Sequence, residues 1–387
     1  MYRRLPLKER SLRLAILCPG FGVVSRGVET STEELARHLS RREPRWYIDI
    51  FCRGPRGRLS DTVRLVHVPA LDRNGRAATL YAQLAHRLGI YLRTRIDAEC
   101  LSFALALLPR ILGAKYDVIF NQAGPFAGVS LKLKRILDGT PFIHKTASGY
   151  SDLELIMAQQ RPNAIVATSP VVKDWLKASV PSLKVECIPN AVERSLFRPY
   201  TAEELRVMRN GLAVFRLERP VVLFVGAMDP MKRPELLVHA VAQLSNVSLV
   251  MVGTGRIQRE IAHLGSNLLG NRFLHVPYVP RKDLALYYNA CDLLTLPSEE
   301  PFGIVFLEAM ACNKPVLAHH SPVQEWIFGD AGATCDCTNT KEYAMAIETL
   351  INRDFGNRPL ERSHAFAWDV IGPKYVELLN QVATSRS

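Results

Sequence analysis

The sequence predicts an α/β protein with two domains, each built on a parallel sheet covered by helices. The length of 387 residues corresponds to two domains of ordinary size. Short apolar, β-branched runs alternate with longer segments whose apolar residues fall three or four positions apart, which is typical of parallel sheets with helices on both faces. Because this alternation occurs once before residue 190 and again after residue 220, we expect two Rossmann-like domains.

The expected strands are the short apolar runs in each half. In the first half they cover residues 14–18, 47–52, 63–68, 118–120, 142–144, 164–168 and 185–188, and in the second half residues 221–225, 247–252, 273–276, 293–296 and 316–318. Apolar residues with helical spacing predict helices that include residues 29–42, 235–244, 283–290 and 304–312.

A polar, helix-prone segment over residues 194–219 separates the two halves. We therefore expect an N-terminal domain over 1–195 and a second domain over 196–365. Apolar residues recur at helical spacing in the tail, so residues 366–387 are expected to form a closing helix that packs back on the N-terminal domain.

The charge of the chain is distributed unevenly. The net charge is +12, yet residues 1–200 contain 31 basic and 17 acidic residues, and residues 201–387 contain 18 and 20. Such asymmetry indicates a basic face for an anionic partner, namely nucleic acid, lipid head groups or a phosphorylated substrate. The alternative is an ordinary solvated surface rich in arginine.

Composition excludes several classes of protein. With 48% hydrophobic and 22% charged residues, the chain is neither disordered nor fibrous, and no run approaches the 18 or so apolar residues of a membrane span. The eight cysteines form no CxxC pair, which favours buried reduced thiols and a cytoplasmic location. The apolar run before Cys18 is too short for a signal peptide and is better explained as a first strand.

The most informative motif is PSEEPFGIVFLEAM over residues 297–310, which follows an apolar strand. Glu300 lies in the loop at the carboxyl end of that strand, where ligands of open α/β sheets bind, and Glu308 lies in the helix that begins near Gly303. The free N–H groups at the helix start suit a phosphate or a sugar hydroxyl. The alternative is that Glu300 is an ordinary loop acid and Glu308 a partner of the helix dipole.

This motif resembles the E-x7-E signature of retaining glycosyltransferases with the GT-B fold. Five further segments also resemble that family, in the same order along the chain: PNAVE at 189–193, FVGAMDPMKRPELL at 224–237, VMVGTG at 250–255, DLLTLPS at 292–298 and EAMACNKPV at 308–316. The resemblance is dense from residue 220 to 330. It implies a GT-B fold, in which the two parallel sheets face an interdomain cleft.

The resemblance also implies roles for residues of the second half. Glu300 would hold hydroxyls of the transferred sugar and Glu308 the nucleotide ribose. The backbone amides of Phe302, Gly303 and Ile304 would meet the sugar and the diphosphate.

Lys232 would neutralise the diphosphate and help the nucleotide to leave; a surface lysine in a turn is the alternative. The family has an arginine where this chain has Ala227. Either the neighbouring Arg233 replaces that arginine or the diphosphate is held more weakly.

Two sites in the first half are assigned by resemblance alone. Gly27 belongs to the glycine-rich loop PGFGVVSRGVE at 19–29, in which Arg26 replaces one glycine of the family pattern. His144 follows an expected strand and resembles a histidine that faces the transferred sugar. A histidine with a purely structural role is the alternative.

The activity implied is retaining transfer of a sugar from a UDP- or GDP-sugar to an acceptor hydroxyl, in glycan, glycolipid or polysaccharide synthesis. The nucleotide sugar would be a co-substrate, with no other cofactor. No Asp-x-Asp pair occurs in the sequence, which agrees with a metal-independent mechanism. A glycan or a lipid-linked molecule would be the acceptor.

A lipid-linked acceptor would give the basic half a role at an anionic membrane surface. Arg87, Arg93, Arg95 and Arg110 flank the apolar stretch over residues 80–112. That stretch is either an interfacial helix of a peripheral protein at the inner face of the membrane or a core helix with arginines reaching to solvent.

Two other classes of protein share features with this sequence. A nicotinamide-dependent oxidoreductase would also have Rossmann domains, but neither glycine turn gives G-x-G-x-x-G with an acidic residue about 20 positions on. A nucleic-acid-binding protein would explain the charge. Aromatic residues are only 8% and are not interleaved with the basic ones, so we expect no nucleic-acid partner.

Overall fold

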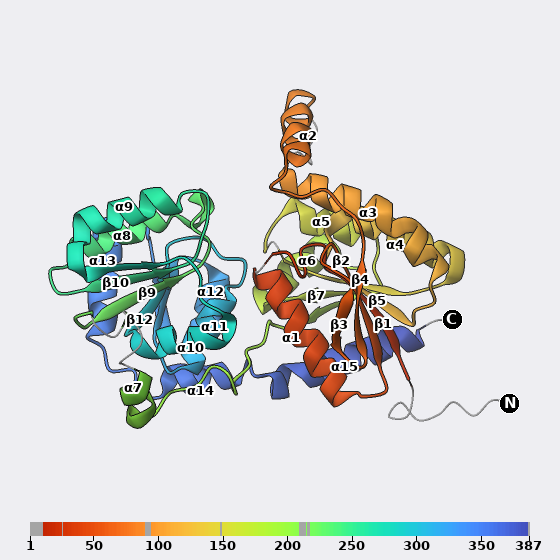
Figure 1. The fold of residues 1–387 in the computed structure, drawn as a ribbon. Helices are drawn as coiled ribbons and strands as arrows, with labels where there is room; N and C mark the ends of the chain where they lie inside the picture. The colour runs from red at the N-terminus through yellow and green to blue at the C-terminus, as the bar shows by residue number, and fades with distance from the viewer. Residues whose placement is uncertain are drawn as a thin grey trace. The chain divides into compact units, whose positions relative to one another are not determined.

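The computed structural model describes residues 11–24, 26–89, 94–147, 149–208, 214 and 217–385, and the chain forms two compact units (Figure 1). The first unit comprises Met1–Pro189 and Ile371–Ser387, and the second comprises Asn190–Val370. The boundaries lie near residues 190 and 370, whereas the sequence suggested 195 and 365. The second unit is therefore an insertion in the chain of the first.

The first unit contains an eight-stranded sheet in the order β3-β4-β2-β1-β5-β6-β7-β8. Every pairing is parallel except that of β3 with β4. The strands are β1 Arg13–Leu17, β2 Tyr47–Cys52, β3 Gly57–Ser60, β4 Val63–His67, β5 Val118–Asn121, β6 Phe142–Lys145, β7 Ala164–Ala167 and β8 Val185–Cys187. Because the strands are mostly buried on both faces, they need continuous apolar runs, which is the pattern that the sequence shows.

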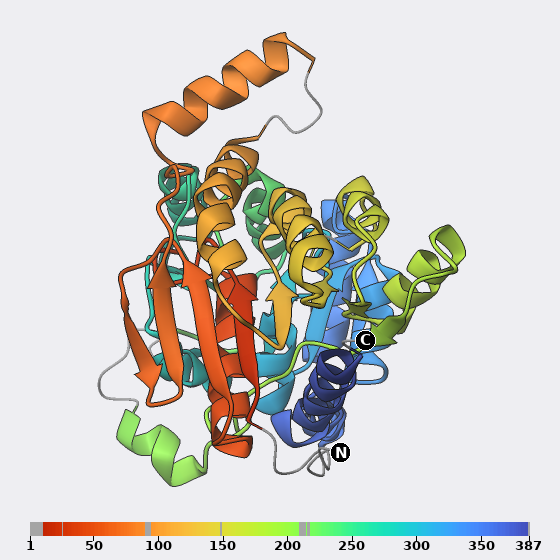
Figure 2. The ribbon, with the colours of Figure 1, turned by 90° about the vertical axis from the view of Figure 1, so that its right-hand side faces the viewer.

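Helices cover both faces of this sheet (Figures 1 and 2). The covering helices are α1 Gly27–Arg42, α3 Arg95–Gly113, α4 Gly124–Asp138, α5 Asp152–Gln159, α6 Pro170–Ser179 and α15 Trp368–Thr384. Helix α2 Arg76–Arg87 stands out from the sheet (Figures 1 and 2). One core cluster joins β1 to α3, with Leu17, Phe103, Leu107 and Phe142 among its buried residues.

Helix α15 brings the end of the chain back to the first unit. The ring of Tyr375 packs edge-on against Phe120 of β5 at a centroid distance of 5.9 Å. Lys184 Nζ, before β8, donates to Gln381 Oε1 at 2.7 Å. The closing helix expected within residues 366–387 is thus present at Trp368–Thr384, and its buried apolar residues complete the sheet's covering.

The second unit contains a six-stranded parallel sheet in the order β11-β10-β9-β12-β13-β14. The strands are β9 Val221–Val225, β10 Ser248–Val252, β11 Phe273–Val276, β12 Leu293–Leu296, β13 Val316–His319 and β14 Gly332–Cys335. The helices are α7 Ala202–Met208, α8 Pro234–Ala242, α9 Gln258–Leu269, α10 Arg281–Ala290, α11 Ile304–Ala311, α12 Pro322–Phe328, α13 Thr340–Ile351 and α14 Arg358–His364, with the short turns η3 Pro230–Lys232 and η4 Gly270–Arg272.

The strand order of the second sheet reverses between β9 and β12. From β9 the chain moves outward through β10 and β11, and from β12 it moves the other way through β13 and β14. The loops after β9 and β12 therefore diverge at the carboxyl edge of the sheet, which is where open α/β sheets bind ligands.

The apolar stretch over residues 80–112 forms parts of two helices rather than one. Helix α3 packs mainly into the core, with Phe103, Leu107 and Ile111 buried and Leu105 exposed. Helix α2 instead exposes Leu80 and Leu84. Arg93 lies outside the described residues.

The eight cysteines are free thiols, six of them buried, as the sequence predicted. None of the helices in the described part of the chain is both long and apolar enough to cross a membrane.

Candidate active site

The loop after β12 carries Glu300 to the carboxyl edge of the second sheet. Strand β12 is fully buried, and the chain then turns through residues 297–303 before α11 begins. Gly303 precedes the helix with φ of 80°, a left-handed conformation that favours glycine. A Cβ at this position would lie 2.5 Å from the ring of Phe306, so glycine is required both for the turn and for the packing.

Glu300 forms an ion pair with Lys232. Lys232 Nζ, in the turn after β9, lies 2.6 Å from Oε1 and 2.7 Å from Oε2 of Glu300. Ser298 Oγ donates to the same Oε1 at 2.6 Å. The structure therefore brings together the two residues that the sequence predicted for the sugar and the diphosphate, from the two strands between which the sheet order reverses.

Glu308 is almost completely buried, with its side chain 2% exposed. Arg281 Nη1, at the start of α10, forms an ion pair with Oε1 of Glu308, and Tyr288 Oη donates to Oε2 at 2.6 Å. Burial and the neighbouring Glu308 carboxylate raise the pKa of Tyr288 well above its usual value, so the phenol keeps its proton. Neither partner could be predicted from the sequence, because neither is spaced regularly from Glu308.

The start of α11 has no side-chain cap. The first N–H groups of a helix have no partner within the helix, so the amides near Gly303 and Ile304 can meet an anion. The carbonyl oxygens of Glu300 and Phe302 accept hydrogen bonds from Gln324 Nε2 of α12, at 3.0 and 3.1 Å. Gln324 is a loop-supporting residue that the sequence did not single out.

Two further arginines lie at the carboxyl ends of β9 and β10. Arg233, with φ of 49°, directs Nη2 to within 3.9 Å of Glu299 Oε1. Arg256 follows the second glycine turn, and its Nε lies 3.2 Å from Asp229 Oδ1. Both are basic residues close to the position of Ala227, where the resembling family has an arginine.

The site residues predicted in the first half belong to the first unit. Gly27 is the first residue of α1 and lies at the carboxyl side of β1. Glu29, two residues later, occupies the space beside Gly20: a Cβ on Gly20 would lie 2.0 Å from Glu29 Oε1. Burial raises the pKa of Glu29. The buried carboxyl group of Glu29 thus packs against Gly20 of the glycine-rich loop.

His144 lies within β6 and is buried. Its Nε2 lies 3.3 Å from Glu154 Oε2, and its Nδ1 lies 3.4 Å from Asn121 Nδ2. Glu154 Oε1 also accepts from the backbone N–H of Ala147 at 2.8 Å. The two contacts engage both ring nitrogens and fix the ring's orientation. The sequence did not predict Glu154 or Asn121 as partners.

Across the described ranges, no group of three or more His, Cys, Asp or Glu side chains is placed to hold a metal ion. The candidate site in the second unit contains a lysine, arginines, carboxylates and free helix amides. Such a set suits a ligand with both a phosphate chain and hydroxyl groups.

Comparison with protein families gives two adjacent matches. Residues 25–196 match Glycosyltransferase Family 4 and residues 213–366 match Glycosyl transferases group 1. Together the matches cover both units, including Gly27, His144, Lys232, Glu300 and Glu308.

Curated relatives match part of the chain. D-inositol 3-phosphate glycosyltransferase from Mycobacterium marinum is 30% identical over 203 residues, which are 48% of this chain and 42% of that protein. The enzyme of the same name from Mycobacteroides abscessus is 32% identical over 200 residues, 48% of this chain and 44% of that protein. The matches span less than half of these relatives' length.

Solved structures match almost the whole chain. A sucrose-phosphate synthase from Thermosynechococcus elongatus has a TM-score of 0.78 at 23% identity, covering 97% of this chain and all of that one. Alr3699/HepE from Anabaena, in complex with UDP and glucose, has a TM-score of 0.73 at 19% identity, covering 95% and 99%. The fold is GT-B, and the chain belongs to the group 1 glycosyltransferases.

Proposed function

We propose that the protein transfers a sugar from a UDP- or GDP-sugar to an acceptor hydroxyl, with retention of the anomeric configuration and without a metal ion. The observation that carries the proposal is the contact between Lys232 and Glu300 at the point where the second sheet's order reverses. A structure of the same fold holds UDP and glucose, which supports a nucleotide sugar as donor.

The Lys232–Glu300 ion pair keeps two opposite charges in place before the donor arrives. A diphosphate offers the ammonium group stronger negative charge than one carboxylate does, so Lys232 would turn to the phosphates. Glu300 would then accept hydrogen bonds from the sugar hydroxyls. Free amides at the start of α11 would hold the remaining phosphate or sugar oxygens.

Glu308 is proposed to bind the nucleotide ribose. Its two oxygens already accept from Arg281 and Tyr288, so the ribose diol would share the carboxylate with them or displace Arg281. Arg281 and Arg233 add positive charge that compensates for Ala227.

The proposed reaction needs no nucleophile from the protein. The bond between the anomeric carbon and the diphosphate oxygen breaks, and a bond from that carbon to the acceptor oxygen forms on the same face. The acceptor's proton passes to the departing diphosphate. Lys232 stabilises the charge that develops on the diphosphate, which is the role of a metal ion in other enzymes.

The acceptor and the cellular setting are also proposals. The acceptor would be a glycan or a lipid-linked molecule bound by the first unit, with His144 facing the transferred sugar and the Gly27 loop close to the donor phosphates. The protein would act in the cytoplasm, at the inner face of the membrane, in glycan, glycolipid or polysaccharide synthesis.

The test is a screen of UDP- and GDP-sugars by nucleotide release, with Glu300→Gln and Lys232→Met as site variants. We expect each variant to lower kcat/KM by about 10²–10³-fold. The matched controls are Glu299→Gln, an exposed neighbour, and Lys341→Met on α13. Full turnover by both site variants would contradict the assignment of Glu300 and Lys232 to the active site.

Stereochemistry and metal use need separate measurements. NMR of the product should show the donor's anomeric configuration, and inversion would contradict the proposed mechanism. Turnover should be unchanged when EDTA is added, and loss of turnover that is restored by a divalent cation would contradict metal independence.

A further inference from the structure

Helix α2 of the first unit exposes a stripe of large apolar side chains. Leu80, Leu84 and Leu88 are 66%, 55% and 66% exposed. Leu80 and Leu84 lie in α2, and Leu88 caps its end. The three are four positions apart and therefore lie on one side of the helix, while Ala78 and Ala85 are its buried residues. In Figures 1 and 2 this helix stands out from the sheet and the other helices of the first unit. Its exposed leucines are unlike the isolated apolar residues of an ordinary surface.

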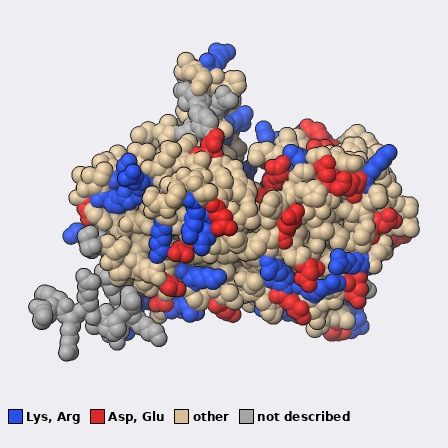
Figure 3. Space-filling model, turned by 180° about the vertical axis from the view of Figure 1, so that it is seen from behind, with Lys and Arg blue, Asp and Glu red and all other residues tan. Residues whose placement is uncertain are grey.

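The charged residues of the segment that contains this stripe have one sign. Residues 73–96 include five arginines and no Asp or Glu. Arg76, Arg87 and Arg95 are exposed, and among the described residues none of these three forms an ion pair. Seen from behind in Figure 3, basic atoms mark the outer end of the projecting helix.

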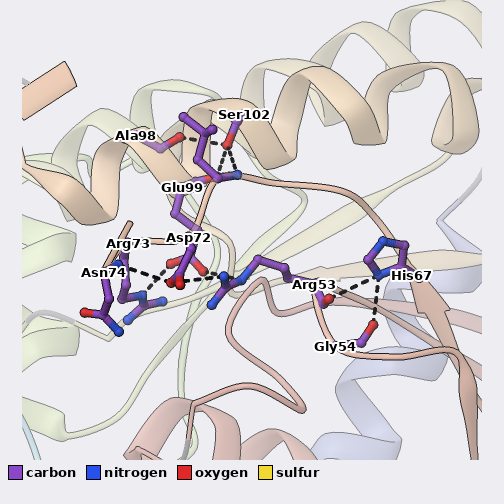
Figure 4. Close-up of polar contacts among 10 residues, drawn as sticks. Arg53, Gly54, His67, Asp72, Arg73, Asn74, Ala98, Glu99 and Ser102 are labelled. Atoms are coloured by element: carbon purple, nitrogen blue, oxygen red, sulfur yellow. Dashed lines mark hydrogen bonds and ion pairs between the residues drawn. The ribbon is translucent and has the colours of Figure 1, made fainter. Parts of the chain in front are cut away.

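The base of α2 is fixed to the body of the first unit by a buried ionic network (Figure 4). Glu99 of α3 is fully buried and forms ion pairs with Arg73 Nε at 2.5 Å and with Arg53 Nε at 3.1 Å. Arg53 Nη1 also lies 3.1 Å from Asp72 Oδ1. The loop that leads into α2 is thus held firmly, and the leucine stripe takes no part in this network.

The exposed leucines together with the nearby arginines favour one kind of partner. A second copy of the same face would bring arginines against arginines, which costs free energy. A nucleic acid would leave the leucine stripe uncovered. A bilayer with anionic head groups would bury the leucines at the level of the acyl chains and pair the arginines with phosphates. We propose that α2 is the element that docks this protein on an anionic lipid surface.

This proposal rests on the proposed location at the inner face of the membrane and names the element that makes the contact. It can fail while the sugar transfer stands, because vesicle binding is measured without donor or acceptor. The experiment is co-sedimentation of the full chain with vesicles of phosphatidylcholine alone and of phosphatidylcholine mixed with phosphatidylglycerol. We expect binding to the mixed vesicles only, and weaker binding as salt is raised. No binding to mixed vesicles at low salt would overturn the proposal.

Variants separate the leucines from the arginines. The triple change Leu80→Ser, Leu84→Ser and Leu88→Ser should abolish vesicle binding. Each of Arg76→Gln and Arg87→Gln should weaken it about fivefold. The matched control carries Leu268→Ser and Met345→Ser, two exposed apolar residues of the second unit, and should bind like the unchanged protein. Equal binding by the leucine variant and the control would overturn the proposal.

The same variants test the competing partner and the folded state. Nucleotide release by the leucine variant should equal that of the unchanged protein, because none of its three positions is in the catalytic machinery. Sedimentation velocity should show no change in mass. If the leucine variant instead converted a dimer to a monomer, the stripe would be an interface between copies and the membrane proposal would be wrong.

Discussion

The side-chain amide of Gln324 donates a hydrogen bond of 3.0 Å to the main-chain carbonyl oxygen of Glu300. The same nitrogen also donates to the carbonyl of Phe302 at 3.1 Å, and the glutamine is only 1% exposed. One buried side chain in α12 therefore holds two main-chain carbonyls of the turn that presents Glu300. The loop's position depends on a residue that makes no part of the motif.

Gln324→Leu should reduce catalysis more than it reduces stability of the fold. The change leaves two carbonyls without a donor and frees the Glu300 turn, and small displacements of a catalytic group can cost about 10²-fold in rate. Steady-state kinetics should show the loss mainly in kcat. Gln243→Leu is the control, because Gln243 also donates to two carbonyls, but on the surface. Equal kinetics for the two variants would contradict the loop-holding role.

Gly303→Ala should impair both folding and turnover. Alanine is strained at φ of 80°, which costs about 1–2 kcal/mol, and its Cβ would overlap the ring of Phe306. Gly356→Ala is matched for positive φ, at 53°, but has nothing within 4 Å. Urea unfolding should show a larger loss for the Gly303 variant by about 1–3 kcal/mol. A similar loss for both would mean that the Phe306 ring simply moves aside.

Arg281→Ala should destabilise the second unit and raise the KM for the donor. It removes the ion-pair partner of a buried carboxylate, and the loss of one partner of a buried pair costs about 3–5 kcal/mol. Arg259→Ala, an exposed arginine of α9, is the control and should be neutral. Thermal unfolding and donor titration measure the two effects. An unchanged melting temperature would show that Tyr288 alone satisfies Glu308.

Lys145 should make the first unit's stability depend on alkaline pH. Burial lowers the pKa of Lys145 from 10.5 to about 8, although charges on Cys18 and Glu34 oppose the shift. Between these pH values the unfolded chain binds a proton that the folded chain does not, so this residue's contribution to the free energy of unfolding rises with pH. Below pH 8 both states are protonated, and the cost of burying the charge is greatest there.

The measurement is the difference in unfolding free energy between Lys145→Met and the unchanged protein. We expect Lys145→Met to have the larger free energy of unfolding at pH 7. The difference from the unchanged protein should shrink by about 3 kcal/mol by pH 10.5. Taking the difference removes the titration of tyrosines and other thiols. A pH-independent difference would mean that the buried ammonium keeps an ordinary pKa.

Most strands could be predicted because their signal is local. Residues 221–225 form a continuous apolar run, residues 47–52 form a run interrupted only by Asp49, and the observed strands have the same limits. The strands β3 and β14 were not predicted. Their sequences, GRLS and GATC, lack an apolar run because both strands lie at sheet edges, where neighbouring strands impose the extended backbone.

The site could be predicted only where a motif carries it. Lys232 and Glu300 were found by resemblance, and the sheet order explains why they meet. Arg281, Tyr288 and Gln324 could not be found, because each reaches its partner from another element at a separation of 20 residues or more. Such contacts follow from helix packing and leave no spacing to detect.

The return of α15 to the first unit also has a consequence for biosynthesis. Tyr375, which packs against Phe120 and lies under the ammonium group of Lys145 at 5.9 Å, is made after the whole second unit. During translation the second unit can fold while the first still lacks one covering of its sheet. The first unit, most of which leaves the ribosome first, is therefore the last to complete its fold.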